Sequence, residues 1–172
     1  FNDTKFKKIN SNQKKLTGNR YNISNKKNSK FINFVESILN KKLIFKKNNI
    51  NENKEIKNII NENFLEELNK IINSEYIISD INQRCHHARG YSIHEIFQDN
   101  ERSFDRIPDL IVYPKEYDDV LNIVKLACKH NVAIVPFGGG TNVSLALTLD
   151  KSEKRMIVSV DMRCMNKIHW ID

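Results

Sequence analysis

Three consecutive glycines, Gly138–Gly140, form the most unusual local pattern in the sequence, because the chain of 172 residues contains only five glycines. They follow an apolar run with the character of a buried strand, and the hydroxyl and amide side chains of Thr141 and Asn142 come directly after them. Successive glycines adopt positive φ without penalty and can point consecutive N–H groups into one concavity, where phosphate oxygens bind. The segment Pro136–Asn142 therefore predicts an anion-binding loop.

A plain glycine turn between two strands is the simpler alternative for this loop. A tight turn needs only one or two glycines with Asn or Asp, so three glycines after a buried strand exceed that need. The loop also departs from two familiar nucleotide signatures. The dinucleotide fingerprint requires a third glycine three residues further on, and the P-loop requires Gly-Lys-Ser/Thr. We therefore expect neither a Rossmann dehydrogenase nor a P-loop NTPase.

The elements that must position this loop follow a strand, helix, strand pattern. Leu110–Tyr113 and Ala133–Phe137 are short apolar runs typical of buried parallel strands, and Glu116–His130 between them has helical spacing. Residues 109–137 therefore predict one right-handed βαβ unit. Asn131 is the expected stop of the helix. The expected apolar face of the helix comprises Val120, Val124 and Ala127.

Further elements are expected on both sides of this unit. Downstream, Met156–Asp161 and Lys167–Ile171 have the pattern of two more strands. Upstream, apolar residues at helical spacing predict amphipathic helices over residues 31–45 and 55–73, and two such helices make self-association plausible.

The basic charge of the chain is concentrated near its beginning. The formal net charge is +7, yet residues 1–50 alone are near +11. Residues 1–30, rich in Asn, Lys and Ser, are expected to be a disordered extension, because they bury too little apolar surface to offset chain entropy. Such a tail leaves open a second class of function, a non-catalytic protein that binds nucleic acid or anionic lipid through its lysines.

Other residues able to do chemistry receive plainer interpretations. Cys85, His86, His87 and His94 could ligate zinc, but adjacent histidines seldom share one ion, so we expect no metal site and histidines at the surface or in a substrate channel. Cys128 is expected to be a small buried residue. Arg106 and Asp109 are expected to form an ion pair at the entrance to the first strand. The three cysteines are widely spaced and predict no disulfide framework.

Several stretches resemble one group of flavoproteins. They are similar to the FAD-binding domain of the vanillyl-alcohol oxidase type and, in combination, to the alkyldihydroxyacetonephosphate synthases. The stretches are His94–Phe97, Arg106–Pro114, Asp118–His130, Val135–Ser144 and Ser159–Ile168. The resemblance covers residues 85–172. It implies the first lobe of a PCMH-type FAD-binding domain, an α/β (α+β) fold.

What this resemblance implies is an FAD-dependent enzyme of ether-lipid synthesis, which exchanges the acyl group of acyl-dihydroxyacetone phosphate for a long-chain fatty alcohol. It implies a peroxisomal location, with the cytoplasm as the alternative compartment. Peripheral membrane association and a homodimer are left open, and nucleic-acid binding is not expected. The family's active site lies under a separate cap domain, so no catalytic residue is assigned here. The residues implied to hold the FAD pyrophosphate are Pro136, Phe137, Gly138, Gly139, Gly140, Thr141 and Asn142.

Two departures from the family's pattern are visible: it usually has Ser where Asn142 stands, and another His in the region of Ala88–Tyr91. The nearest alternative is an FAD-linked 2-hydroxy-acid dehydrogenase of the D-lactate or glycolate type. Those proteins share the glycine loop but follow it with Leu-x-Gly-Gly, whereas Val143–Ala146 follows here. The expected organisation is a disordered extension over residues 1–30, a helical region over 31–84 and part of the flavin domain over 85–172. Because the chain begins at Phe1 and ends after a strand-like run, we expect a longer protein.

Overall fold

The computed structural model describes residues 6–10, 13–19, 21–28, 30–44, 56, 58–101 and 103–172. The chain divides into two compact units, Phe1–Lys47 and Asn48–Asp172. The glycine loop lies in the second unit.

The first unit contains a small antiparallel sheet of β1 (Phe6–Asn10), β2 (Gln13–Leu16) and β3 (Lys27–Asn28). The expectation of disorder over residues 1–30 is therefore wrong for these strands. Asn25 explains part of the difference: it adopts φ 63°, its N–H donates to the carbonyl of Leu16, and its side chain donates to the carbonyl of Gly18. Asn tolerates the left-handed region, so an Asn-rich composition supplies turns as well as disorder.

Helices form where apolar periodicity predicts them, but both are shorter than expected. α1 (Phe31–Leu39) ends because Asn40 adopts φ 48°, a left-handed stop. α2 (Glu62–Ile71) begins only after Asn61, whose side chain accepts a hydrogen bond from the N–H of Phe64. The predicted helical positions 45, 55 and 57 lie outside the described residues.

The second unit is built on a four-stranded sheet in the order β4-β5-β7-β6. β5 (Leu110–Val112), β7 (Ile157–Asp161) and β6 (Ala133–Phe137) run parallel, and β4 (Ile77–Ile78) is antiparallel at one edge. Three strands predicted from apolar runs are thus confirmed. The sequence pattern did not show that β7 lies between β5 and β6, so the strands of the predicted βαβ unit are parallel but not neighbours.

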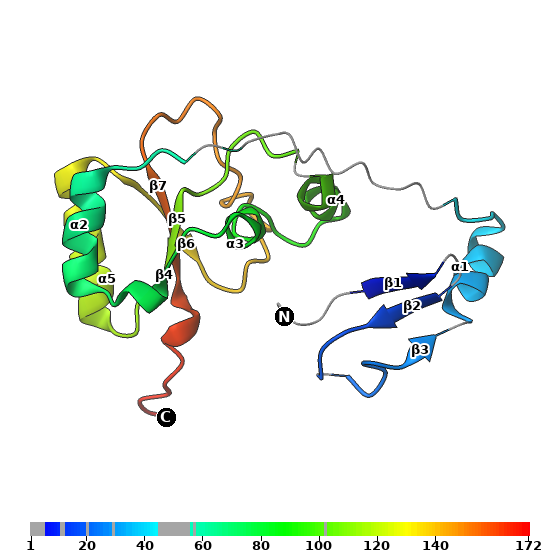
Figure 1. Cartoon of the computed structure of the whole chain (residues 1–172). Coiled ribbons are helices and arrows are strands. Elements are labelled where there is room, and N and C mark those ends of the chain that lie inside the picture. The colour runs from blue at the N-terminus through cyan, green and yellow to red at the C-terminus, as the bar shows by residue number, and fades with distance from the viewer. Residues whose placement is uncertain are drawn as a thin grey trace. The chain divides into compact units, whose positions relative to one another are not determined.

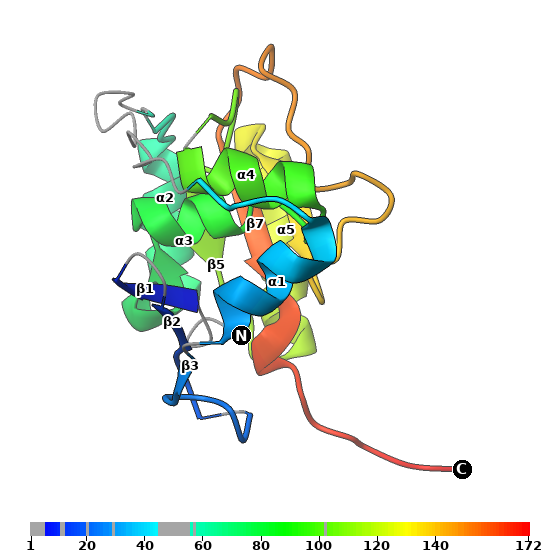
Figure 2. The same cartoon turned by 90° about the vertical axis from the view of Figure 1, so that its right-hand side faces the viewer.

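Helices cover both faces of this sheet. Figure 1 shows α2 and α5 (Tyr117–His130) on one face, and Figures 1 and 2 together place α3 (Ile81–His86) and α4 (Ile93–Glu101) on the other. Short 3-10 turns, Ser74–Tyr76 and Met162–Cys164, complete the elements. The main core is apolar and lies between the sheet and the α2/α5 layer. Its buried members include Phe64, Leu68, Leu110, Val112, Ile123, Ala127, Val158 and Val160.

The predicted ends of α5 are confirmed, but its buried face differs in part from the predicted one. The Glu116 and Asp119 side chains form a reciprocal capping box at its start, and Asn131 adopts φ 53° at its end. Ile123 and Ala127 are its buried residues, whereas Val124 is 43% exposed. The predicted burial of Ala127 is therefore confirmed, whereas Ile123 is buried in place of Val124. Cys128, expected to be buried, is exposed.

The predicted strand at Lys167–Ile171 is wrong. After the 3-10 turn that follows β7, the chain leaves the sheet, and none of the described strands pairs with this segment (Figures 1 and 2). Ile168, Trp170 and Ile171 are exposed. An apolar run alone does not make a strand, because strand structure also needs a hydrogen-bonding neighbour. Within the described part of the chain, no helix is both long and apolar enough to cross a membrane.

Candidate flavin-phosphate site

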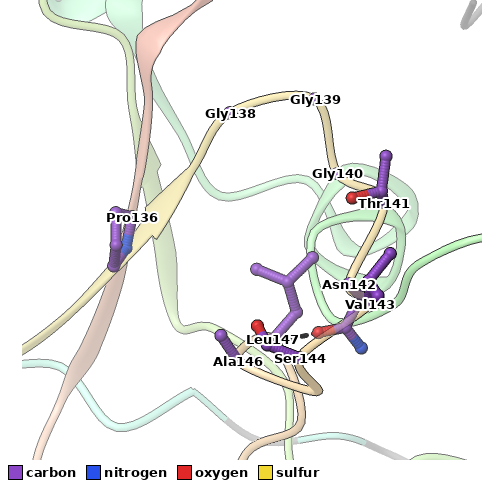
Figure 3. A pocket seen from close by; sticks show the side chains of 10 residues that line it. All are labelled: Pro136, Gly138, Gly139, Gly140, Thr141, Asn142, Val143, Ser144, Ala146 and Leu147. Atoms are coloured by element: carbon purple, nitrogen blue, oxygen red, sulfur yellow. Dashed lines mark hydrogen bonds between the residues drawn. The ribbon is translucent and has the colours of Figure 1, made fainter.

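The glycine loop leaves β6 at the carboxyl end of the three parallel strands and borders an open cavity of about 350 Å³. Figure 3 shows it as an arch, with the Leu147 side chain pointing into the space below Gly138 and Gly139. Ligands of open α/β sheets commonly lie outside the carboxyl ends of the strands. The cavity is lined by Pro136, Gly138, Gly139, Gly140, Thr141, Asn142, Val143, Ser144, Ala146 and Leu147.

The three glycines are not equivalent. A Cβ at Gly138 would meet nothing within 4 Å, and a Cβ at Gly139 would meet only the Thr141 methyl at 3.9 Å. Gly140 has φ +67°, and a Cβ there would lie 2.5 Å from the ring of Phe137. Gly140 therefore serves the fold, whereas Gly138 and Gly139 leave the backbone uncovered toward open space, where a ligand can approach closely.

Phe137 and Thr141 have different places in the loop: Phe137 supports it from within the fold, and Thr141 faces the cavity. Phe137 is buried, and its ring centroid lies 4.3 Å from that of His87, so its side chain anchors the loop rather than lining the cavity. Thr141 is exposed and lines the cavity with its hydroxyl group (Figure 3). Of the seven residues implied by the resemblance, only Phe137 is absent from the cavity wall.

Asn142 lines the cavity, but its side-chain amide is occupied by the protein. Its Oδ1 accepts a 2.7 Å hydrogen bond from the N–H of Leu147, drawn as a dashed line in Figure 3, and its Nδ2 donates to Glu95 Oε1. The residue adopts φ 55°. Asn is among the few residues other than glycine that adopt this conformation readily. Its amide thus shapes the loop instead of remaining free for a ligand.

Glu95 is a site residue that the sequence patterns did not reveal. Its carboxylate accepts hydrogen bonds from the N–H of Gly90 at 2.8 Å, the hydroxyl of Ser92 at 2.6 Å and the amide of Asn142. Burial alone would raise the pKa of Glu95, but the hydrogen bonds from Ser92, Asn142 and Gly90 outweigh it and lower the pKa to about 2. The carboxylate is therefore ionised at neutral pH.

Gly90 fits tightly against the loop. A Cβ at this position would lie 2.4 Å from the carbonyl oxygen of Thr141 and 2.5 Å from the Cβ of Asn142. The backbone at Gly90 and the backbone at Thr141 thus touch directly. Two signals could have pointed to this contact: Gly90 is one of five glycines, and Ser92-x-x-Glu95 has the spacing of a helix capping box.

His87 and Asp161 support the carboxyl edge of the sheet. His87 Nε2 lies 2.8 Å from Asp161 Oδ2, and His87 Nδ1 lies 2.8 Å from the carbonyl oxygen of Gln83. Burial would raise the pKa of Asp161, but hydrogen bonds from His87 and Arg163 lower it overall. The expectation of surface or channel histidines is wrong for His87, which is 1% exposed.

The other residues considered as zinc ligands, Cys85, His86 and His94, do not gather around a common point. Cys85 packs with Phe104 and Ile107, and His94 is exposed. Burial, with the positive charge of Arg89, lowers the pKa of His86 to about 4, so the ring is neutral at neutral pH. No group of three or more His, Cys, Asp or Glu side chains within the described ranges could hold a metal ion.

The expected ion pair of Arg106 and Asp109 is confirmed, and it lies away from the cavity. Asp109 is fully buried and also accepts hydrogen bonds from the N–H groups of Ile59 and Ile157, at 2.9 Å and 2.8 Å. It therefore fastens the segment before α2 to the start of β7. Its role is structural.

Comparison with known proteins shows what this part of the chain is similar to. Residues 108–172 match the family described as FAD binding domain. The chain is similar in sequence and in structure to the alkyldihydroxyacetonephosphate synthases. It is 32% identical to the Caenorhabditis elegans alkyldihydroxyacetonephosphate synthase over 163 residues, which cover 91% of this chain and 26% of that protein. A solved structure of an alkyldihydroxyacetonephosphate synthase matches 99% of this chain with a TM-score of 0.75 at 25% identity, and 33% of that chain is covered.

The expected resemblance, its mixed α/β fold and FAD as the cofactor of this domain are thereby confirmed. The dehydrogenase alternative has weaker support: a mitochondrial D-lactate dehydrogenase of Arabidopsis thaliana is 26% identical over 99 residues, 58% of this chain and 16% of that protein. This chain spans only about a quarter of the length of the Caenorhabditis elegans relative.

Proposed function

We propose that the loop Pro136–Asn142 holds the pyrophosphate of FAD in an FAD-dependent alkyldihydroxyacetonephosphate synthase. The uncovered backbone at Gly138 and Gly139, directly above a cavity, is the observation that carries this proposal. A phosphate oxygen needs close approach to backbone N–H groups, and a loop without Cβ atoms allows it. The match of residues 108–172 to an FAD-binding family supports the same ligand.

The residues present fit this group with a division of labour. Gly138, Gly139 and the hydroxyl of Thr141 would face the pyrophosphate, because they line the cavity and have no competing contacts among the interactions described above. Phe137 and Asn142 would support the loop without contacting the pyrophosphate through their side chains, because Phe137 packs on His87 and the Asn142 amide donates to Glu95. This assignment proposes direct side-chain or backbone contact with the pyrophosphate for fewer residues than the seven that the resemblance implies.

The reaction proposed for the protein is the exchange of the acyl group of acyl-dihydroxyacetone phosphate for a long-chain fatty alcohol. The flavin would supply the reactive ring that makes the exchange feasible, and the residues of this chain would bind and orient its phosphate end. We propose that the residues acting on substrate lie elsewhere in the protein. Support comes from relatives named for this synthase activity, of which the chain covers 18% to 26%.

A peroxisomal location is also part of the proposal, and it rests on relatedness to the synthases. Imaging of the tagged protein against a peroxisomal marker would test it. A diffuse signal in cells that retain normal peroxisomes would remove this part of the proposal while leaving the flavin assignment intact.

The central experiment is a titration of the chain with FAD and with ADP, followed by flavin fluorescence and calorimetry. Gly139→Val should weaken binding of both ligands at least tenfold, because its side chain would fill the space that the pyrophosphate needs. Thr148→Val is the matched control, since Thr148 is exposed and is absent from the cavity wall. Full affinity in Gly139→Val would refute the assignment, and so would failure of the complete flavin domain, of which this chain is expected to be a part, to bind either ligand.

A further inference from the structure

The two carboxylate oxygens of Glu95 have different partners. Oε2 accepts from the N–H and the hydroxyl of Ser92, and the Ser92 hydroxyl accepts from the N–H of Glu95 at 3.2 Å. This reciprocal pair is a capping box at the start of α4. Oε1 instead accepts from the N–H of Gly90 and the amide of Asn142, 47 residues away along the chain. The helix cap explains the contacts of Oε2 but not those of Oε1.

We propose that Glu95 is a positioning residue that sets the shape of the glycine loop through Asn142. The proposed role in FAD binding rests on the function proposed above, but the role in ordering the loop does not. Glu95 is not placed as a ligand contact, because it is buried and absent from the cavity wall. An ionised carboxylate would also repel a pyrophosphate at close range.

The loop needs such a support because the last residue of the loop and a residue shortly after it, neither of them glycine, have left-handed backbones. Asn142 has φ 55° and Leu145 has φ 59°. For Leu this conformation is strained, and strained backbone persists only when surrounding contacts enforce it. Asn142 supplies two of these contacts: its Oδ1 accepts from the N–H of Leu147, and its carbonyl accepts from the N–H of Leu145 at 3.0 Å.

The orientation of the Asn142 amide is therefore decisive. If Nδ2 is held by Glu95, Oδ1 faces the Leu147 N–H and closes the turn. Without Glu95 the amide loses the partner that fixes its rotation, and the buried N–H of Leu147 loses a reliable acceptor. Gly90 reinforces the arrangement, because the same Glu95 oxygen holds its N–H while its backbone abuts Thr141.

The first test measures the loop without any flavin, by amide hydrogen exchange of Leu147 in the full chain. Glu95→Ala should lower the protection factor of this amide at least tenfold. Ser92→Ala is the matched control, because it removes the hydroxyl from the capping box but leaves the Asn142 contact, and it should change that protection less than threefold. Unchanged protection in Glu95→Ala, or an equal loss in Ser92→Ala, would overturn the proposal.

Glu95→Gln gives a conservative variant should Glu95→Ala fail to fold. Its side-chain oxygen can still accept from Gly90 and Asn142 while its amide donates to the Ser92 hydroxyl. Protection of the Leu147 amide should stay within threefold of the unaltered chain. A tenfold loss in Glu95→Gln would show that negative charge, rather than the hydrogen bond to Asn142, is required, and would reject the proposed mechanism.

A double-mutant cycle links the loop to the cofactor. Asn142→Gly keeps the left-handed backbone accessible and removes the amide. Glu95→Ala and Asn142→Gly should each raise the dissociation constant for FAD about tenfold, and the double variant should be no worse than either alone, because both act on one contact. Fully multiplicative losses would contradict coupling through Asn142. If the complete flavin domain does not bind FAD, the proposed function fails, and the exchange experiment alone decides the role of Glu95.

Discussion

His87 Nε2 lies 2.8 Å from Asp161 Oδ2, which joins the residue after α3 to the last residue of β7. Both side chains are buried, and the His87 ring also packs on Phe137 at the root of the glycine loop. Both ring nitrogens face oxygen acceptors, Asp161 on one side and the Gln83 carbonyl on the other. One side chain thus connects a helix, two strands and the loop.

Replacement of His87 tests this connection. His87→Ala should destabilise the fold by about 3 kcal/mol, because it opens a cavity beside Phe137 and removes one partner of a buried Asp161. Urea denaturation would measure the loss. His87→Phe fills the volume without the hydrogen bond and should recover only part of it. A loss below about 1 kcal/mol in His87→Ala would mean that this contact does not support the edge of the sheet.

Acid should reduce stability in two pH windows that overlap near pH 4. The pKa of His86 is lowered from 6.5 to about 4, so the unfolded chain binds more protons there and stability falls as pH drops from 6.5 to about 4. Glu95, with its pKa lowered from 4.5 to about 2, contributes stability that is lost between those values. Denaturation curves collected from pH 7 to about pH 2 would follow both windows. His86→Asn should flatten the upper window alone, and an unchanged slope there would contradict the assignment.

Alanine substitutions at Gly140 and Gly138 compare a glycine that the backbone conformation requires with one that has free space around it. Gly140→Ala should cost roughly 2 kcal/mol, because the residue has φ +67° and the added Cβ would strike the Phe137 ring. Gly138→Ala should change stability by less than about 0.5 kcal/mol, because a Cβ there meets no neighbouring atom. Thermal unfolding without ligand would compare them. Equal destabilisation by both substitutions would show that the loop adopts another shape.

The small sheet of the first unit carries opposed lysines. The register places Lys15 directly opposite Lys7. Like charges directly opposite one another are destabilising. Lys15→Glu should therefore stabilise the sheet by about 0.5 kcal/mol, visible as slower amide exchange in β2. The gain should shrink in 0.5 M salt, because exposed charges are screened, whereas a gain independent of salt would exclude this electrostatic cause.

Local patterns predicted the parts of the fold that depend on local structure. The strands β5, β6 and β7, the ends of α5 and the glycine loop all follow from apolar runs, caps and glycines in short windows. The contact of Glu95 with Asn142 did not follow, because its partners lie 47 residues apart and ordinary capping already accounts for Ser92 and Glu95. Neither did the burial of His87, which depends on a carboxylate 74 residues further on.

Errors arose where tertiary contacts decide the outcome. Val124 has the spacing of a buried residue, yet Ile123 occupies the position that faces the sheet. Lys167–Ile171 has the composition of a strand, yet no described strand pairs with it.

The position of β7 between β5 and β6 determines when the glycine loop can take shape. β6 has no described strand partner other than β7, which is the segment that follows the loop in the sequence. During synthesis, the two earlier parallel strands must therefore wait for residues 157–161 before they share a sheet. Residues 138–156, which include the glycine loop, are then held at both ends by adjacent strands. The connection that carries the loop is therefore closed only when residues 157–161 pair with both earlier strands.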